Sequence, residues 1–270
     1  MARVKTLVIT GYGTNCENES AHAARLAGSD ETDIVFFSDI QAGRVRIDRY
    51  DFLIFPGGFL DGDDLGAAQA AALRWRHAKT ASGESILDQF KRFFDAGGAV
   101  LGICNGFQLL VKLGMLPAVG GAYFTRQVSL SNNDSARFED RWVTLKANPK
   151  SPCIFTNGLD ILDMPVRHGE GKIIPQDDAI LQAAVDAELV ALRYAHPATG
   201  EPTQEYPYNP NGSPLAIAGL TDPSGRILGL MPHPEAFNDP TNHPDWTRGA
   251  RPTLGVALLE NGISRLKAGL

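Results

Sequence analysis

The chain has 270 residues, of which 43% are hydrophobic and 21% are charged. These proportions are typical of a globular protein, and the length suits one large domain or a domain with a substantial extension. The net charge of -6 argues against nucleic acid or an anionic membrane as the main partner, because both are bound mostly through basic surfaces.

Three cysteines, Cys16, Cys104 and Cys153, are scattered along the chain without a Cys-x-x-Cys pair. This set indicates neither a disulfide framework nor a cysteine zinc site, and we expect no metal and no cofactor. No run approaches the roughly 18 apolar residues that span a bilayer. The apolar run within residues 1–10 is too short for a secretion signal and is better explained as a first strand. We therefore expect a cytoplasmic, reducing location.

Buried strands alternate with helices over the first hundred residues. The pattern predicts strands at 6–10, 33–37, 50–55 and 99–103, and helices at 17–27, 65–77, 85–96 and 107–113. Such alternation is typical of βαβ units, and it predicts a mostly parallel twisted sheet with helices on both faces. Ligands of such α/β sheets bind at the carboxyl ends of the strands, which is where Gly11, Pro56 and Cys104 fall.

The second half changes to short strands separated by turns. We expect strands at 128–130, 142–146, 154–155, 166–168, 189–194, 216–220 and 227–231, and a closing helix at 254–266. Residues 221–225 have the composition of a hairpin turn. The proline-rich stretch 197–214 is an excursion rather than a linker, because strands resume directly after it. One domain over residues 1–270, with a small antiparallel elaboration, is the simplest prediction.

Cys104 is the strongest candidate for a nucleophile. It lies in Gly102-Ile103-Cys104-Asn105-Gly106, between a buried strand and a helix, which is the layout of a hydrolase nucleophile elbow with sulfur replacing oxygen. Glycines relieve the crowding of such a sharp turn, and the helix N-terminus would stabilise a thiolate. The alternative, a small buried hydrophobic residue in a glycine-rich turn, explains the flanking glycines less well.

A cysteine nucleophile needs a base, and the base needs a group that orients it. Met231-Pro232-His233-Pro234-Glu235 directly follows a predicted strand. Its two prolines exclude a helix interior or a sheet centre and predict an extended loop, in which His233 and Glu235 face the same way. Glu235 would then hold the His233 imidazole in one tautomer. A surface loop without function is the alternative, which the Cys104 motif makes less attractive.

Other histidines are weaker candidates. His168 competes with His233, since the glycines in His168-Gly169-Glu170-Gly171 suit either a backbone that approaches a ligand or an ordinary turn. His243 could share a metal site with Glu235, although the spacing of a helical zinc motif is missing. His22, His77 and His196 are expected at the surface.

Pro56-Gly57-Gly58-Phe59 follows the third predicted strand. Its glycines leave a bare backbone N–H facing the same crevice, and with the N–H of Asn105 this would form an oxyanion hole, in which one donor typically contributes about 3 kcal/mol. A plain Pro-Gly turn is the alternative. Gly11-Tyr12-Gly13 lacks the third glycine of a dinucleotide-binding motif.

These three motifs, around Cys104, Gly58 and His233, occur in the order seen in class I (triad) glutamine amidotransferases, which the chain resembles. Further segments are similar to the glutaminases that serve phosphoribosylformylglycinamidine synthase in de novo purine synthesis: Asn105 itself, 13–16, 135–141, 168–171 and 209–213. The resemblance covers nearly the whole chain, and it implies a flavodoxin-like fold.

The resemblance implies a role for each motif. Cys104 would be the nucleophile, His233 the base and acid, and Glu235 the residue that orients His233. Gly58 and Asn105 would donate to the oxyanion, while Gln108 and Gly57 would bind the substrate glutamine. The chain has no ATP-binding portion, so the implied partner is a separate synthetase subunit of phosphoribosylformylglycinamidine synthase, with room for a small accessory subunit, and neither nucleic acid nor membrane.

Two segments depart from the family's usual pattern. Pro56-Gly57-Gly58-Phe59 is followed by Leu60-Asp61-Gly62-Asp63-Asp64, and Gly66 stands where an arginine is common. After Glu235 an extended segment from Ala236 to Trp246 replaces the usual arginine. Both departures lie near the rim of the expected site. They therefore affect the expected contacts with a partner more than the expected catalytic triad.

Three other functions fit parts of the pattern. An amidotransferase could feed a different acceptor, although Asn105 and the 209–213 loop argue against it. A cysteine peptidase or deglycase on a related fold would not need the His233-Pro234-Glu235 arrangement. A scaffold subunit with a dead site would not need an intact triad.

Overall fold

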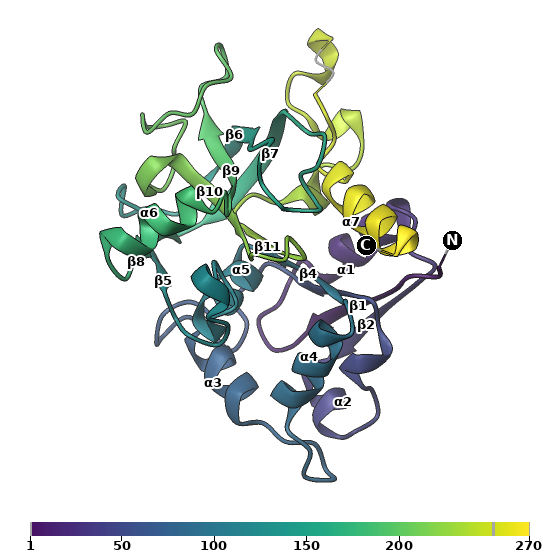
Figure 1. Ribbon diagram of the computed structural model, residues 1–270. Coiled ribbons are helices and arrows are strands. Elements are labelled where there is room, and N and C mark those ends of the chain that lie inside the picture. The colour runs from purple at the N-terminus through teal and green to yellow at the C-terminus, as the bar shows by residue number, and fades with distance from the viewer. Residues whose placement is uncertain (1, 250–251, 270) are drawn as a thin grey trace.

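A nine-stranded sheet runs through the computed structural model, which describes residues 2–249 and 252–269 (Figure 1). Five strands are parallel to one another: β1 (Lys5–Thr10), β2 (Glu31–Phe36), β3 (Phe52–Phe55), β4 (Ala99–Ile103) and β11 (Ile227–Leu230). Four continue the same sheet in antiparallel pairing: β10 (Ile217–Thr221), β9 (Val190–Ala195), β6 (Glu139–Ala147) and β7 (Ile161–His168).

The strand order is β2-β1-β3-β4-β11-β10-β9-β6-β7. Its parallel part has the flavodoxin-like order, in which the chain reverses direction beside β1 and leaves a crevice at the carboxyl ends of the strands. A separate antiparallel ribbon pairs β5 (Val128–Asn132) with β8 (Glu170–Pro175). The antiparallel elaboration is thus larger than expected, and most of it belongs to the main sheet.

Helices cover both faces of the parallel strands (Figure 1). The helices are α1 (Glu17–Leu26), α2 (Phe37–Gln41), α3 (Gln69–His77), α4 (Ile86–Asp95), α5 (Asn105–Leu113), α6 (Asp178–Asp186) and α7 (Ala257–Ala268). Helix α7 lies beside α1, while α3 packs against both α4 and α5. None of the helices in the described part of the chain is long and apolar enough to cross a membrane.

Local sequence accounts for most of the parallel half. All residues of β3 and β4 are buried, as their continuous apolar runs require in a sheet covered on both faces. Helix α4 begins where the Ser85 hydroxyl accepts a hydrogen bond from the amide of Asp88, and Gly97 follows its end with φ of 97°. Aromatic side chains of Phe55, Trp75 and Phe90 then fill the core between the sheet and these helices.

Two expectations about elements are wrong, and some elements were not predicted. Ile154 and Phe155 lie in a turn rather than a strand, and α2, α6 and β8 were not predicted. The helix expected from residue 65 begins at Gln69, because residues 60–68 form a loop that is fastened to other elements. Its Ala67 amide donates to Oε2 of Glu170 over 3.1 Å.

Candidate active site

Cys104 lies on a strained turn between β4 and α5. Its φ of 51° and ψ of -104° are unusual for a residue with a side chain. The two glycines of the motif permit this turn, because a Cβ on Gly106 would come within 1.9 Å of the Phe55 carbonyl oxygen and one on Gly102 within 2.8 Å of the Gly106 oxygen. The turn presents the Cys104 thiol to a pocket of about 460 Å³.

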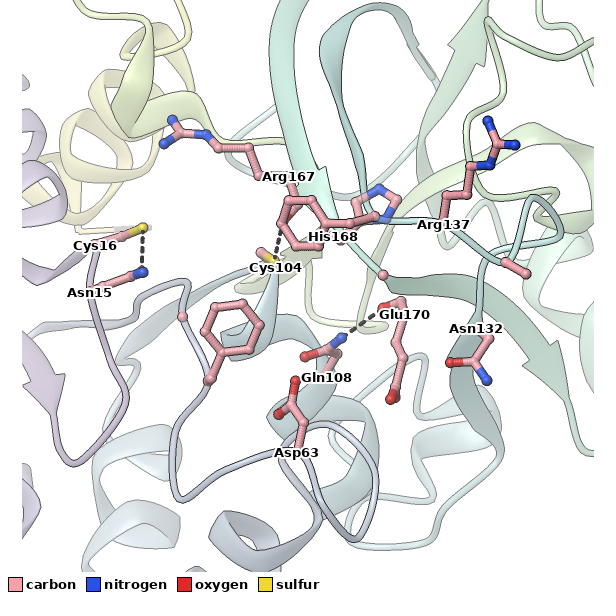
Figure 2. A pocket seen from close by; sticks show the side chains of 15 residues that line it. Asn15, Cys16, Asp63, Cys104, Gln108, Asn132, Arg137, Arg167, His168 and Glu170 are labelled. Carbon is pink, nitrogen blue, oxygen red and sulfur yellow. Dashed lines mark hydrogen bonds between the residues drawn. The ribbon is translucent and has the colours of Figure 1, made fainter.

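The pocket opens at the carboxyl ends of the parallel strands (Figure 2). Asn15 and Cys16 line it from the loop after β1, Gly58 and Phe59 from the loop after β3, and Cys104 from the turn after β4. The opposite wall is the β7–β8 connection together with the loop between β5 and β6, which contributes Arg137 and Phe138. This is the position that the predicted sheet assigned to a ligand.

His233 and Glu235 form a buried pair beside this pocket. Nδ1 of His233 lies 2.6 Å from Oε1 of Glu235, and both side chains are almost completely buried. The sequence predicted an extended segment here, and this prediction is wrong, because residues 234–236 form one turn of 3₁₀ helix. That turn, together with a hydrogen bond from the His233 amide to the Pro165 carbonyl of 2.8 Å, brings the two side chains together.

The imidazole of His233 faces Cys104 across Gly57. A Cβ on Gly57 would lie 2.7 Å from Cε1 of His233 and 3.5 Å from Cβ of Cys104. Burial opposes the charged imidazolium, but the Glu235 carboxylate favours it, and the pKa of His233 is raised well above its usual value. The surroundings of His233 therefore favour its protonated form.

Gly58 lines the same pocket, and Asn105 follows Cys104 directly at the start of α5. The loop after β3 is bound to the loop after β1 by hydrogen bonds from Phe59 N to Gly13 O and from Asn15 N to Gly57 O, which leave the Gly58 amide outside this pairing. Gly58 has φ of 138°, and a Cβ there would come within 2.7 Å of the Gly13 oxygen. Asn105 is the first residue of α5, so its amide has no acceptor within the helix.

Comparison with protein-family models agrees with this geometry. A model described as a CobB/CobQ-like glutamine amidotransferase domain matches residues 3–263. The chain belongs to this glutamine amidotransferase family. The resemblance inferred from the three motifs is thereby confirmed, and with it the α/β fold class.

Individual relatives narrow the similarity within the family. The chain is 43% identical over 246 residues to phosphoribosylformylglycinamidine synthase subunit PurQ of Dehalococcoides mccartyi, covering 91% of this chain and 90% of the relative. PurQ of Methanococcus maripaludis is 41% identical over 231 residues, covering 86% and 81%. A chain in the solved structure of PurLQS from Thermotoga maritima matches with a TM-score of 0.70 and 26% identity, over 98% of this chain and 100% of that one.

A chain of hydrogen bonds joins the elbow of this amidotransferase to the opposite wall of its pocket. The Leu60 amide donates to Oδ1 of Asn105 over 3.0 Å, and Nδ2 of Asn105 donates to Oε1 of Gln108 over 2.9 Å. Nε2 of Gln108 then donates to the Glu170 carbonyl over 2.6 Å (Figure 2). Gln108 is therefore fixed in the pocket, which is where a residue that binds substrate must lie.

The acidic loop after β3 reaches the amidotransferase pocket through Asp63. Asp61 pairs with Arg74 at 2.7 Å, while Asp64 is exposed. Burial raises the pKa of Asp63, and the charge of Glu170 adds to this effect. Gly66, where the family resemblance led us to expect an arginine, lies near a cation from another element, since a Cβ there would be 3.5 Å from Nζ of Lys112. The sequence did not predict that Glu170 acts on this loop, because the loop lies about a hundred residues before it in the chain.

His168 lines the pocket in a defined neutral form. Nδ2 of Asn133 donates to the carbonyls of Arg137 and His168, over 2.9 and 2.8 Å, which fixes Oδ1 of Asn133 toward Nδ1 of His168 at 3.1 Å. Nδ1 therefore carries the proton, and the buried Nε2 is left as an acceptor. Burial, and then the charge of His233, lower the pKa of His168 to about 4.

The remaining candidates lie elsewhere. His243 is buried against Trp142, with ring centroids 4.9 Å apart, and its Nε2 is 3.6 Å from Asp163. It belongs to the extended segment after Glu235, which is anchored where Phe237 packs on Trp142. His22 and His77 are exposed, and His196 is half-buried against Tyr208. Cys153 is fully buried outside the pocket lining.

Proposed function

We propose that the chain is the glutaminase subunit of a phosphoribosylformylglycinamidine synthase. It would hydrolyse glutamine to glutamate and ammonia, and pass the ammonia to an ATP-dependent synthetase subunit in de novo purine synthesis. The similarity to PurQ proteins over nine-tenths of the chain supports the substrate and the partner. We also propose that one glutaminase domain spans the chain, and that it works in the cytoplasm, where its three free cysteines stay reduced.

Cys104 acts as the nucleophile in this proposal. Its thiolate attacks the side-chain amide carbon of glutamine, and the amides of Gly58 and Asn105 stabilise the oxyanion that forms. His233 donates its proton to the nitrogen as the carbon–nitrogen bond breaks, which releases ammonia and leaves a glutamyl thioester on Cys104. Neutral His233 then takes a proton from water, the hydroxide attacks the thioester, and glutamate departs as the Cys104 thiolate and protonated His233 are restored.

The observation that carries the proposal is that three strand ends meet at Gly57. Gly57 itself follows β3, Cys104 follows β4, and His233 and Glu235 follow β11. The Cys104 side chain and the His233 ring both approach this glycine, while Glu235 contacts His233. A nucleophile, an acid–base group and an orienting carboxylate in this order are the parts that acyl transfer needs.

The experiment is a glutaminase assay of the purified chain, alone and with the candidate synthetase loaded with ATP and formylglycinamide ribonucleotide. The proposal predicts glutamate formation that increases with the synthetase, and formylglycinamidine ribonucleotide as the product of the complex. Glutamine turnover without transfer to this acceptor would favour an amidotransferase that serves another synthetase. Cleavage of a peptide, but not of glutamine, would favour a peptidase.

A further inference from the structure

Cys16 is a buried thiol that the proposed reaction does not use. It lies directly before α1, and its Sγ is 3.2 Å from Oδ1 of Asn15. Cys16 lines the same pocket as Cys104 (Figure 2). A Cβ on Gly57 would lie 3.4 Å from Sγ of Cys16, in addition to its contacts with His233 and Cys104. Two thiols and one imidazole therefore approach a single point that the absent side chain of Gly57 keeps open.

The donor atoms around this point are close enough for one ion. One atom each of Cys16, His233 and Glu235 lie within 4.8 Å of one another, and all three residues are buried. Cys104 stands outside that group of three, but its Cβ approaches the same point at Gly57, and it lines the same pocket as Cys16. Glu235 already holds Nδ1 of His233 at 2.6 Å, so Nε2 is the nitrogen left for a ligand.

We propose that Cys16, Cys104 and His233 bind a divalent cation of the zinc class, and that this cation inhibits the enzyme. Thiolate sulfur and imidazole nitrogen are the donors that zinc and cadmium prefer. A carboxylate on the second ring nitrogen, as Glu235 provides, is the usual support of a zinc-bound histidine. Three protein ligands leave the fourth tetrahedral position to water. Cysteine spacing could not indicate this site, because its ligands come from three separate loops.

Binding exchanges protons for metal bonds. Two metal–sulfur bonds and one metal–nitrogen bond form, while one proton leaves Cys16 and one leaves the Cys104–His233 pair for the buffer. Metal affinity should therefore rise with pH. The bound cation occupies the sulfur and the nitrogen that the proposed hydrolysis needs. Inhibition, but not binding itself, thus rests on the proposed function.

Cadmium offers a direct test, because each cadmium–thiolate bond adds to an ultraviolet charge-transfer band. The reduced chain would be titrated with cadmium chloride, beside Cys16→Ala, Cys104→Ala and the matched control Cys153→Ala. We expect one equivalent to bind with the intensity of two thiolates in the wild type and in Cys153→Ala. Each of the other two variants should show half that intensity and at least tenfold weaker binding.

The proposal is wrong if the wild type shows no band at one equivalent, or if Cys16→Ala binds cadmium as the wild type does. Circular dichroism would verify that each variant is folded, and Cys16→Ser would replace Cys16→Ala if the alanine variant is not.

Zinc inhibition of glutamine hydrolysis provides the second readout. We expect a chelator to reverse it and Cys16→Ala to raise the inhibitory zinc concentration at least tenfold. A normal cadmium band in a chain that never hydrolyses glutamine would keep the metal site and reject the function. If the chain hydrolyses glutamine, but zinc does not inhibit it and no cadmium band forms, the function would be kept and the metal site rejected.

Discussion

Nδ1 of His233 lies 2.6 Å from Oε1 of Glu235, and both side chains are almost completely buried. The carboxylate retains a proton on the imidazole that burial alone would remove. One histidine can therefore begin the reaction as an acid for the departing ammonia and continue it as a base for water. The contact also leaves Nε2 as the ring nitrogen that is free to take part in the reaction.

His233 and His168 should differ in what their removal changes. His233→Ala should lower kcat for glutamine hydrolysis by about 10²- to 10⁴-fold, because the leaving group loses its acid. His168→Ala should act mainly on KM, because His168 is neutral and lines the pocket. Steady-state kinetics of the two variants would measure this, and equal losses of kcat at unchanged KM would contradict the ranking.

Cys104 should be the thiol that reacts with a glutamine-analogue electrophile. All three cysteines are buried, but only Cys104 lies on a strained elbow between a strand and a helix, with φ of 51°. Peptide mass mapping after labelling should place the adduct on Cys104 in preference to Cys16 and Cys153. Predominant labelling of Cys16 would move the nucleophile to the loop after β1.

His168 should make the stability of the fold depend on pH. Its pKa is about 4 when folded and about 6.5 when unfolded, so between these values the unfolded chain binds more protons. The contribution of His168 to the free energy of unfolding should therefore fall as the pH drops from 6.5 to 4, by up to about 3 kcal/mol, and this one contribution should be constant above pH 6.5. His233 is protonated in both states in this window, since its pKa is raised.

Urea unfolding at pH 7, 6 and 5 would measure this effect, with His168→Gln as the matched variant. The wild type should lose stability relative to the variant as the pH falls. Parallel curves for the two proteins would show that His168 is not buried in its neutral form.

The acidic loop 60–64 should mediate control by the synthetase. The Leu60 amide donates to the side chain of Asn105, one of the proposed oxyanion donors, so a partner that moves this loop would also move the oxyanion site. The isolated chain should hydrolyse glutamine slowly, and the loaded synthetase should raise kcat by adjusting the loop that carries Gly57 and Gly58. Replacing Asp61, Asp63 and Asp64 with asparagine should weaken this activation more than the basal rate.

Hydrolysis rates against synthetase concentration would test this gating, with Asp88→Asn on α4 as a control outside the loop. A full rate without the synthetase, or identical activation curves for the wild type and the triple variant, would exclude it.

The sequence was sufficient for the parts of the molecule that depend on neighbouring residues. The apolar runs of β3 and β4, the Ser85 cap and the glycines around Cys104 each have a local physical cause, and the structure has these elements within a few residues of the predicted bounds. The 221–225 hairpin was also predicted, and it joins β10 to β11.

Contacts between distant segments could not be predicted in this way. Glu170 fixes the loop before α3 across about a hundred residues, which shortens that helix. Asn133 determines the tautomer of His168 from another strand connection. The proximity of Cys16 to His233 joins the loop after β1 to the loop after β11, two strand ends that are far apart in the sequence. Sequence spacing carries no signal for any of these contacts.

The most direct test of the account separates glutamine-dependent from ammonia-dependent synthesis in the assembled enzyme, with wild type and Cys104→Ala. The substitution removes the nucleophile and little volume, so the fold and the partner should be retained. We expect Cys104→Ala to abolish synthesis of formylglycinamidine ribonucleotide from glutamine while synthesis from added ammonium continues at the wild-type rate. Glutamine-dependent synthesis that survives in Cys104→Ala would contradict the account.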